Sequence, residues 1–381
     1  MDTLFDLMQE ILRTDEHHYY SRSNIKSSFN LEDLLSREEN AKNYISEYFS
    51  LGQKKKLFEE EIQRPFHVLS VYLLGIVLYK ITNHDEHVKK EIDEIVKKIN
   101  DSGYYSFEYF WYLTALFHDQ AYYYENNISR EFQYNIFGLN NLFQKSTYNP
   151  GKKHVYVNQH PRYDKNLYLK YMEFKIQEFG SSVDHGIYGA SILFERARHN
   201  LITKFLESEG SISNLPLNEF YFKNLQWSAN HLDIFRKISF TILDHNVWRQ
   251  DDIDLVNKYD LNELYNDNYI KVNDEAHPLL FLLCLVDTID PIKYIDQPGK
   301  HHNQSIYGIL NNISIEYEQG SLLRIVFNKS YFLNLQSFNV KKLKKAIKSL
   351  EQFMDLTVTV EEDSKNDIFL LMWGYWYKYL L

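Results

Sequence analysis

Hydrophobic residues occur along this chain mainly in long runs, and these runs predict helices that are buried on most sides. The strongest are residues 66–81 and 107–125, in which apolar side chains surround nearly the whole helical circumference. Helical patterns also cover residues 167–179, 181–206, 232–248 and 277–290. The sequence therefore predicts a mainly α-helical fold.

The pattern changes near residue 303, where helical spacing gives way to alternation of apolar and polar residues. Residues 313–328 are typical of two strands joined at a Gly-containing turn. An amphipathic helix over residues 340–354 and a strand over residues 356–362 follow. We therefore expect a helical extension over residues 1–60, a helical domain over residues 61–302 and a small α+β domain over residues 303–381.

Composition and charge narrow the class of protein. The 381 residues are 44% hydrophobic, which is enough for one large core and a smaller domain. The net charge of −10 argues against an extended nucleic-acid surface. The single cysteine, Cys284, forbids an internal disulfide and fits a reducing compartment.

The N-terminal segment is acidic and amphipathic, unlike a signal peptide, and the longest apolar run is too short to span a bilayer. We expect a cytoplasmic protein with no membrane association. The sequence leaves its oligomeric state open.

Metal-capable side chains interrupt five of the apolar stretches. A single histidine in such a place is more often a core residue than a ligand. Ionised carboxylates, however, are rarely buried without a partner or a metal. One divalent cation would satisfy the whole set, which consists of His67, His118, Asp119, His185, His245 and Asp287.

This ordered set resembles the HD superfamily of metal-dependent phosphohydrolases over about residues 65–294. The His118-Asp119 pair ends an apolar helix, and Asp287 lies in a leucine-rich run similar to the family's D-x-L-D. The resemblance implies an HD-type helical core in which one divalent metal is held by His67, His118, Asp119 and Asp287.

The number of metals has two alternatives under this resemblance. In the binuclear form, His185 and His245 hold a second metal that Asp119 bridges. In the form with one metal, His185 contacts the substrate and transfers protons or binds phosphate. The ligand types suit Mn, Fe, Ni, Co or Zn, and suit Mg less well.

The implied activity is hydrolysis of a phosphoester or phosphoanhydride in a small phosphate, with a nucleotide favoured, by a metal-activated water. Asp119 and His185 are the implied catalytic residues. The alternative is a catalytically weak HD module that binds a nucleotide and regulates a partner. Gln120 and Ala121 depart from the small apolar residue and glycine that follow the pair in many relatives, which keeps this alternative open. Phosphate-loop, dinucleotide-fold and serine-hydrolase motifs do not occur.

A loop is predicted over residues 143–164, between the stretches that carry His118 and His185. It concentrates basic side chains in an acidic protein, and long loops in compact domains are often functional. The loop is either a phosphate-gripping lid or a solvated surface segment. The candidate phosphate ligands are Lys152, Lys153, His160 and Arg162.

Three further acids lie beside these residues and have other expected roles. Asp184 precedes a predicted helix and Asp290 precedes a proline, so both are expected to cap helices. Asp244 is either a group that orients His245 or an exposed residue.

Overall fold

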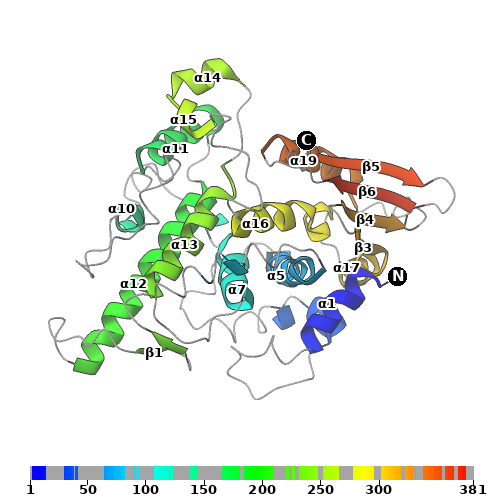
Figure 1. Cartoon of the computed structure of the whole chain (residues 1–381), viewed down its shortest axis with the longest axis horizontal. Coiled ribbons are helices and arrows are strands. Elements are labelled where there is room, and N and C mark those ends of the chain that lie inside the picture. Colours follow the sequence, from blue (N-terminus) through cyan, green and yellow to red (C-terminus); the bar gives the residue numbers. More distant parts are fainter. Residues whose placement is uncertain are drawn as a thin grey trace. The chain divides into compact units, whose positions relative to one another are not determined.

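The computed structural model describes residues 2–13, 30–37, 39–41, 64–81, 89–90, 93, 107–119, 121–122, 137–143, 165–180, 184–209, 220–222, 225–227, 231–247, 252–265, 278–295, 302–318, 322–328, 331, 338–353, 357–363 and 368–374. The chain divides into two compact units. Unit 1 comprises Met1–Val88 with Val272–Leu381, and unit 2 comprises Lys89–Lys271. The described elements are mainly helices, which confirms the predicted fold class (Figure 1).

The core of unit 1 is built on two apolar helices, α5 (Arg64–Ile81) and α16 (Pro278–Ile289), which pack against each other. Every residue of α16 is buried, as expected for a helix that is apolar on all sides. The short helices α1 (Leu4–Arg13), α2 (Leu31–Ser36) and α17 (His302–Asn311) pack together, and α1 also contacts α5. The 3-10 helix η4 (Pro291–Tyr294) directly follows α16.

Unit 1 also contains an antiparallel sheet with strand order β3-β4-β6-β5. Its strands are β3 (Ile313–Glu318), β4 (Leu322–Asn328), β5 (Thr357–Asp363) and β6 (Ile368–Gly374). Helix α19 (Val340–Phe353) contacts α16, η4 and β5. Its buried Leu343, Ile347 and Leu350 recur at the spacing of one helical face.

Unit 2 is built around α12 (His185–Glu209) and α13 (His231–Asp244), which pack side by side and both contact α7 (Phe107–Phe117) (Figure 1). Helix α10 (Phe137–Phe143) packs on α12 and contacts α11 (Lys165–Phe179). A two-stranded antiparallel sheet of β1 (Phe220–Phe222) and β2 (Leu225–Trp227) lies against α12.

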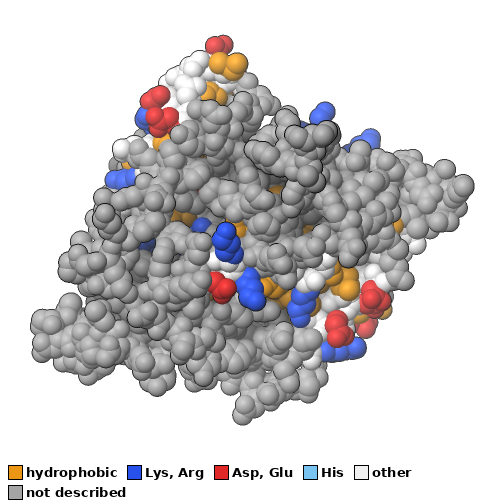
Figure 2. Space-filling view, in the orientation of Figure 1, with side chains coloured by type: hydrophobic (Ala, Val, Ile, Leu, Met, Phe, Trp, Pro, Cys, Tyr) orange, Lys and Arg blue, Asp and Glu red, His pale blue; other side chains and the backbone are white. Residues whose placement is uncertain are grey.

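Two short helices complete unit 2, and the N-terminal end of the first exposes both acidic and apolar side chains. These are α14 (Ile253–Lys258) and α15 (Asn262–Tyr265). Asp252, Ile253 and Asp254 are all exposed there, and Figure 2 shows red and orange side chains together in this region. Asp252 caps α14, since its side chain accepts from the backbone N–H groups of Asp254 and Leu255.

The predicted α+β character of the C-terminal region is confirmed, but the change from helix to strand comes later than expected. The region around residue 303 belongs to α17, and the first strand begins at Ile313. Strand β6 was not among the predicted elements. Unit 1 joins N-terminal and C-terminal residues, so the units follow other boundaries than the predicted domains, whose limits stay predictions.

The described helices include none that combines the length and apolarity needed to cross a membrane.

Candidate metal centre

His118 and Asp119 lie in the turn that ends α7. The helix is almost wholly apolar and buried, so its end carries these two polar residues into the interior of unit 2. The last carbonyl groups of a helix have no partner within the helix. The Nδ1–H of His118 donates to one of them, the Ala115 carbonyl, at 2.5 Å. A carbonyl can only accept, so the other ring nitrogen, Nε2, is the one suited to binding a metal.

His245 occupies the same local position at the end of α13. It is the first residue after the helix, and its Nδ1–H donates to the Ile242 carbonyl at 2.5 Å. The same reasoning makes its Nε2 the metal-binding nitrogen. The rings of His118 and His245 meet edge to face with centroids 5.5 Å apart. Two helix ends in unit 2 therefore present two imidazoles that are held by the same kind of backbone hydrogen bond.

His185 is placed differently, because it is the first residue of α12 rather than the residue after a helix. Two glycines let this end of α12 approach its neighbours. A Cβ at Gly186 would lie 2.9 Å from the Ile242 carbonyl oxygen, and one at Gly189 would lie 3.2 Å from the Phe117 carbonyl oxygen. Larger residues there would push α12 away from α13 and α7, which carry His245 and Asp119.

Asp119, His185 and His245 form a compact buried set within unit 2. Their ligand atoms all lie within 4.8 Å of one another. Ligands around one ion, with bonds of ~2.1 Å, are separated by about 3–4 Å. The set therefore fits a divalent cation after small side-chain shifts.

The two carboxylate oxygens of Asp119 face different histidines. Oδ1 lies 3.5 Å from His185 Nε2, and Oδ2 lies 3.5 Å from His118 Nε2. Burial of this carboxylate is costly unless a cation compensates its charge. The geometry allows each oxygen to bind a separate cation.

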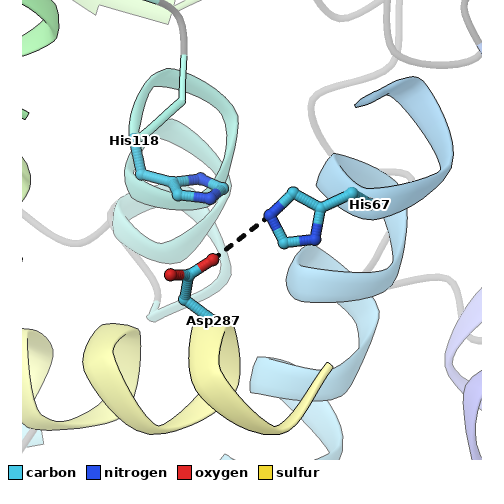
Figure 3. Close-up of side chains that lie close together, drawn as sticks. All are labelled: His67, His118 and Asp287. Atoms are coloured by element: carbon cyan, nitrogen blue, oxygen red, sulfur yellow. Dashed lines mark ion pairs between the residues drawn. The ribbon is translucent and has the colours of Figure 1, made fainter. Parts of the chain in front are cut away.

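In unit 1, His67 is oriented by a carboxylate and not by a backbone carbonyl. Its Nδ1–H donates to Asp290 Oδ2 at 2.6 Å, and the Ser70 hydroxyl donates to Asp290 Oδ1 at 2.5 Å. His67 and Ser70 lie one turn apart on α5, so both face Asp290. This bond directs Nε2 of His67 toward Asp287, whose Oδ1 lies 3.2 Å away (Figure 3). That separation suits two neighbouring ligands of one metal, about 3 Å apart.

Asp287 has a second partner on the same oxygen. Lys293, in η4, donates from Nζ to Asp287 Oδ1, and its side chain is 31% exposed. Burial raises the pKa of the neighbouring Tyr294 hydroxyl well above its ordinary value, and the negative charges of Asp287 and Asp290 add to this effect. Tyr294 therefore stays protonated and donates to the Thr288 carbonyl.

The three neighbouring acids are all buried and have distinct roles. Asp184 caps α12 as predicted, because its Oδ1 accepts from the backbone N–H groups of Gly186 and Ile187. Asp290 caps η4 as predicted, and it also orients His67, which the sequence did not indicate. Asp244 is not an exposed residue, since it accepts a hydrogen bond from the buried Tyr168 hydroxyl at 2.6 Å.

The structure thus gathers the predicted ligands into a set in each unit. Unit 2 brings together His118, Asp119, His185 and His245, and unit 1 brings together His67 and Asp287. Asn246 and Lys293 were missed. Asn246 donates to Asp184 at 2.9 Å and lies 3.4 Å from His185 Nδ1. The candidate phosphate ligands Lys152, Lys153, His160 and Arg162 lie outside the described residues.

Comparison of the chain with protein families, curated proteins and solved structures gave no match. The buried His and Asp clusters, which could hold a metal ion, are therefore the observation from which a function can be argued.

Proposed function

We propose that this chain is a metal-dependent phosphohydrolase that cleaves a phosphoester or phosphoanhydride bond in a small phosphate, with a nucleotide as the favoured substrate. The observation that carries the proposal is the buried set of Asp119, His185 and His245. The order of these residues along the chain, together with His67, His118 and Asp287, adds the resemblance to the HD superfamily.

The chemistry of the ligands supports a transition metal. Imidazole nitrogens with one carboxylate suit Mn, Fe, Ni, Co or Zn. Such an ion would polarise a phosphoryl oxygen and activate a water for attack on phosphorus. The backbone carbonyls of Ala115 and Ile242 fix two of the rings before any ion binds. Asp119 supplies the charge that attracts the ion and, with its two oxygens, the means to bridge a second one.

The first metal of the binuclear form is a prediction from the sequence. It would be shared by His67, His118, Asp119 and Asp287, which come from both units, and it stays a prediction. Its support is that His67 Nε2 and Asp287 Oδ1 lie 3.2 Å apart within unit 1, a separation that two ligands of one metal can have. Phosphate contacts from Lys152, Lys153, His160 and Arg162 likewise stay predictions.

Metal analysis combined with an activity assay tests the proposal. The purified full chain is stripped with a chelator, reloaded with Mn²⁺, Fe²⁺, Co²⁺, Ni²⁺, Zn²⁺ or Mg²⁺, and assayed on a generic phosphodiester and a panel of nucleotides. We expect one or two tightly bound ions per chain, and hydrolysis that is lost on chelation and restored by the metal.

The alternative function predicts a different result in the same experiment. A protein that retains no metal and hydrolyses none of the substrates, but binds a nucleotide, would be a regulatory module. That outcome would overturn the enzymatic proposal. Bound metal without hydrolysis of any substrate in the panel would also count against it, because the metal's role would then be structural.

A further inference from the structure

Lys293 holds an unusual position next to a predicted metal ligand. It lies in η4, six residues after Asp287, and its ammonium donates to Asp287 Oδ1. His67 Nε2 lies 3.2 Å from this same oxygen (Figure 3). One oxygen therefore contacts a buried imidazole on one side and a partly exposed lysine on the other.

We propose that Lys293 binds the phosphate of the substrate, and that Asp287 holds its ammonium at the site until metal and substrate arrive. This inference rests on the proposed function, since it takes Asp287 as a metal ligand. A divalent cation and an ammonium compete for the same carboxylate oxygen because they repel each other at close range. Metal binding would therefore release the lysine from Asp287.

The released ammonium has the properties that a phosphate contact needs. Lysine is a compact charge on a flexible stem, and it binds phosphate as a point charge. The side chain of Lys293 is 31% exposed, whereas that of Asp287 is 12% exposed, so the lysine can reach solvent without crossing the core. A phosphate drawn to the metal would replace Asp287 as its partner.

A purely structural ion pair explains the arrangement less well. A partly exposed ion pair contributes little to stability. Asp287 already has His67 beside it, and Asp290, not Lys293, caps η4. A lysine that served only in such a pair would weaken metal binding at Asp287 while stabilising the fold very little.

The competition between lysine and metal gives two effects of opposite sign in one variant. In Lys293→Met, Mn²⁺ affinity of the full chain without phosphate should rise about 2- to 5-fold, because a competing cation is removed. Affinity of the Mn²⁺-loaded protein for inorganic phosphate should fall about 10- to 100-fold, because a hydrogen bond between charged groups is lost. Both are measured by titration calorimetry. Lys293→Arg should keep phosphate affinity within a few-fold.

Lys258→Met is the matched control. Lys258 pairs with Glu178 at 2.6 Å on the surface of unit 2. The Lys258→Met variant therefore removes the same charge as Lys293→Met without changing the contacts of Asp287. Neither affinity should change in this variant. Lys293→Gln, checked by thermal unfolding, serves as a second test if the methionine variant folds poorly.

The outcomes separate this inference from the proposed function. If wild type binds metal and hydrolyses substrate, but Lys293→Met and Lys293→Gln bind phosphate as wild type does, Lys293 has no phosphate role. A fall in Mn²⁺ affinity in these variants would also overturn the inference. If wild type binds no metal, the proposed function and this inference both fail; if it binds metal and hydrolyses substrate but binds no inorganic phosphate, only this inference fails.

Discussion

The two units orient their metal-capable histidines by different means. In unit 2, His118 and His245 each donate from Nδ1 to a backbone carbonyl three residues earlier, at the end of a helix. In unit 1, His67 donates to the side chain of Asp290, which also accepts from Ser70. The first arrangement depends on where a helix ends, and the second depends on a side chain 223 residues away in sequence.

This difference has a consequence for mutation. A backbone carbonyl remains after any substitution at its residue, so the imidazoles of unit 2 are oriented by an acceptor that no substitution removes. The imidazole of unit 1 loses its orientation when Asp290 changes. The two units also differ in the side chains that surround the carboxylate of the ligand set. In unit 1, Asp287 is paired with the ammonium of Lys293, whereas in unit 2 the oxygens of Asp119 face the imidazoles of His118 and His185.

The largest effect is expected for Asp119→Ala. The change removes the carboxylate of unit 2's ligand set, so this variant should bind no metal at that set and lose its activity completely. Thermal unfolding with and without Mn²⁺ checks the cause, because wild type should be stabilised by the ion and the variant should not. Asp254→Ala, at an exposed acid of the same unit, is the control. Full metal content and rate in Asp119→Ala would make Asp119 a structural residue.

His185→Ala should distinguish one metal from two. If His185 is a ligand, bound metal falls from about two to about one ion per chain. If it transfers a proton or contacts phosphate, metal content stays constant and the rate falls by about 10²–10⁴. We expect the loss of metal, because Asp119, His185 and His245 lie together. His199→Ala, at an exposed histidine of the same helix, should change neither quantity.

A wild-type stoichiometry of one ion, with unchanged metal content in His185→Ala, would contradict the binuclear form. The position of His185 makes this result informative. Its Nδ1 lies 3.4 Å from the amide of Asn246, a longer contact than the 2.5 Å from His118 and His245 to their carbonyls, so this contact fixes its ring less firmly for metal binding.

The sequence predicted the burial of the ligand candidates because their signal is local. His118, His245 and Asp287 stand out as polar residues in apolar helical runs, and burial of each is confirmed. The partners of these residues were harder to predict. Asp290 was expected only to cap, since nothing in its neighbourhood indicates that α5 places His67 beside it. Lys293 contacts Asp287 only because the chain turns into η4 after α16.

The fold shows the same contrast between local and distant signals. Continuous apolar runs predicted α5, α7 and α16, because a helix that is buried all round needs no partner to be recognised. The segment around residue 303 was expected to change to strand, but it forms α17, which packs on α1 and α2. Those contacts come from the N-terminal part of the chain, which the local pattern does not reveal.

Asp290→Asn should separate the two ways of orienting histidine. The amide keeps most of the shape but presents an N–H₂ group or a weaker acceptor to His67 Nδ1 and to the Ser70 hydroxyl. Loss of an orienting carboxylate typically costs 10- to 100-fold in metal affinity, and we expect a decrease of this size in Mn²⁺ titrations. Asp252→Asn, at the cap of α14, changes an exposed capping carboxylate outside the predicted ligand set and should leave affinity unchanged. Equal Mn²⁺ affinities in Asp290→Asn and wild type would show that Asp290 acts only as the N-cap of η4.

The smallest effects are expected when one hydrogen-bond donor to a buried acid is removed in each unit. Ser70→Ala removes the hydroxyl that donates to Asp290, and Tyr168→Phe removes the hydroxyl that donates to Asp244. Both should lower the melting temperature, because a hydrogen bond to a charged acceptor contributes about 1.5–3 kcal/mol. Only Ser70→Ala should also weaken Mn²⁺ binding, by about 2- to 5-fold, since Asp290 orients His67 while the Ile242 carbonyl orients His245. Titration calorimetry and thermal unfolding on both variants measure the difference. A decrease in metal affinity for Tyr168→Phe as large as that for Ser70→Ala would show that unit 2 also depends on a side chain, through Asp244, to orient its histidine.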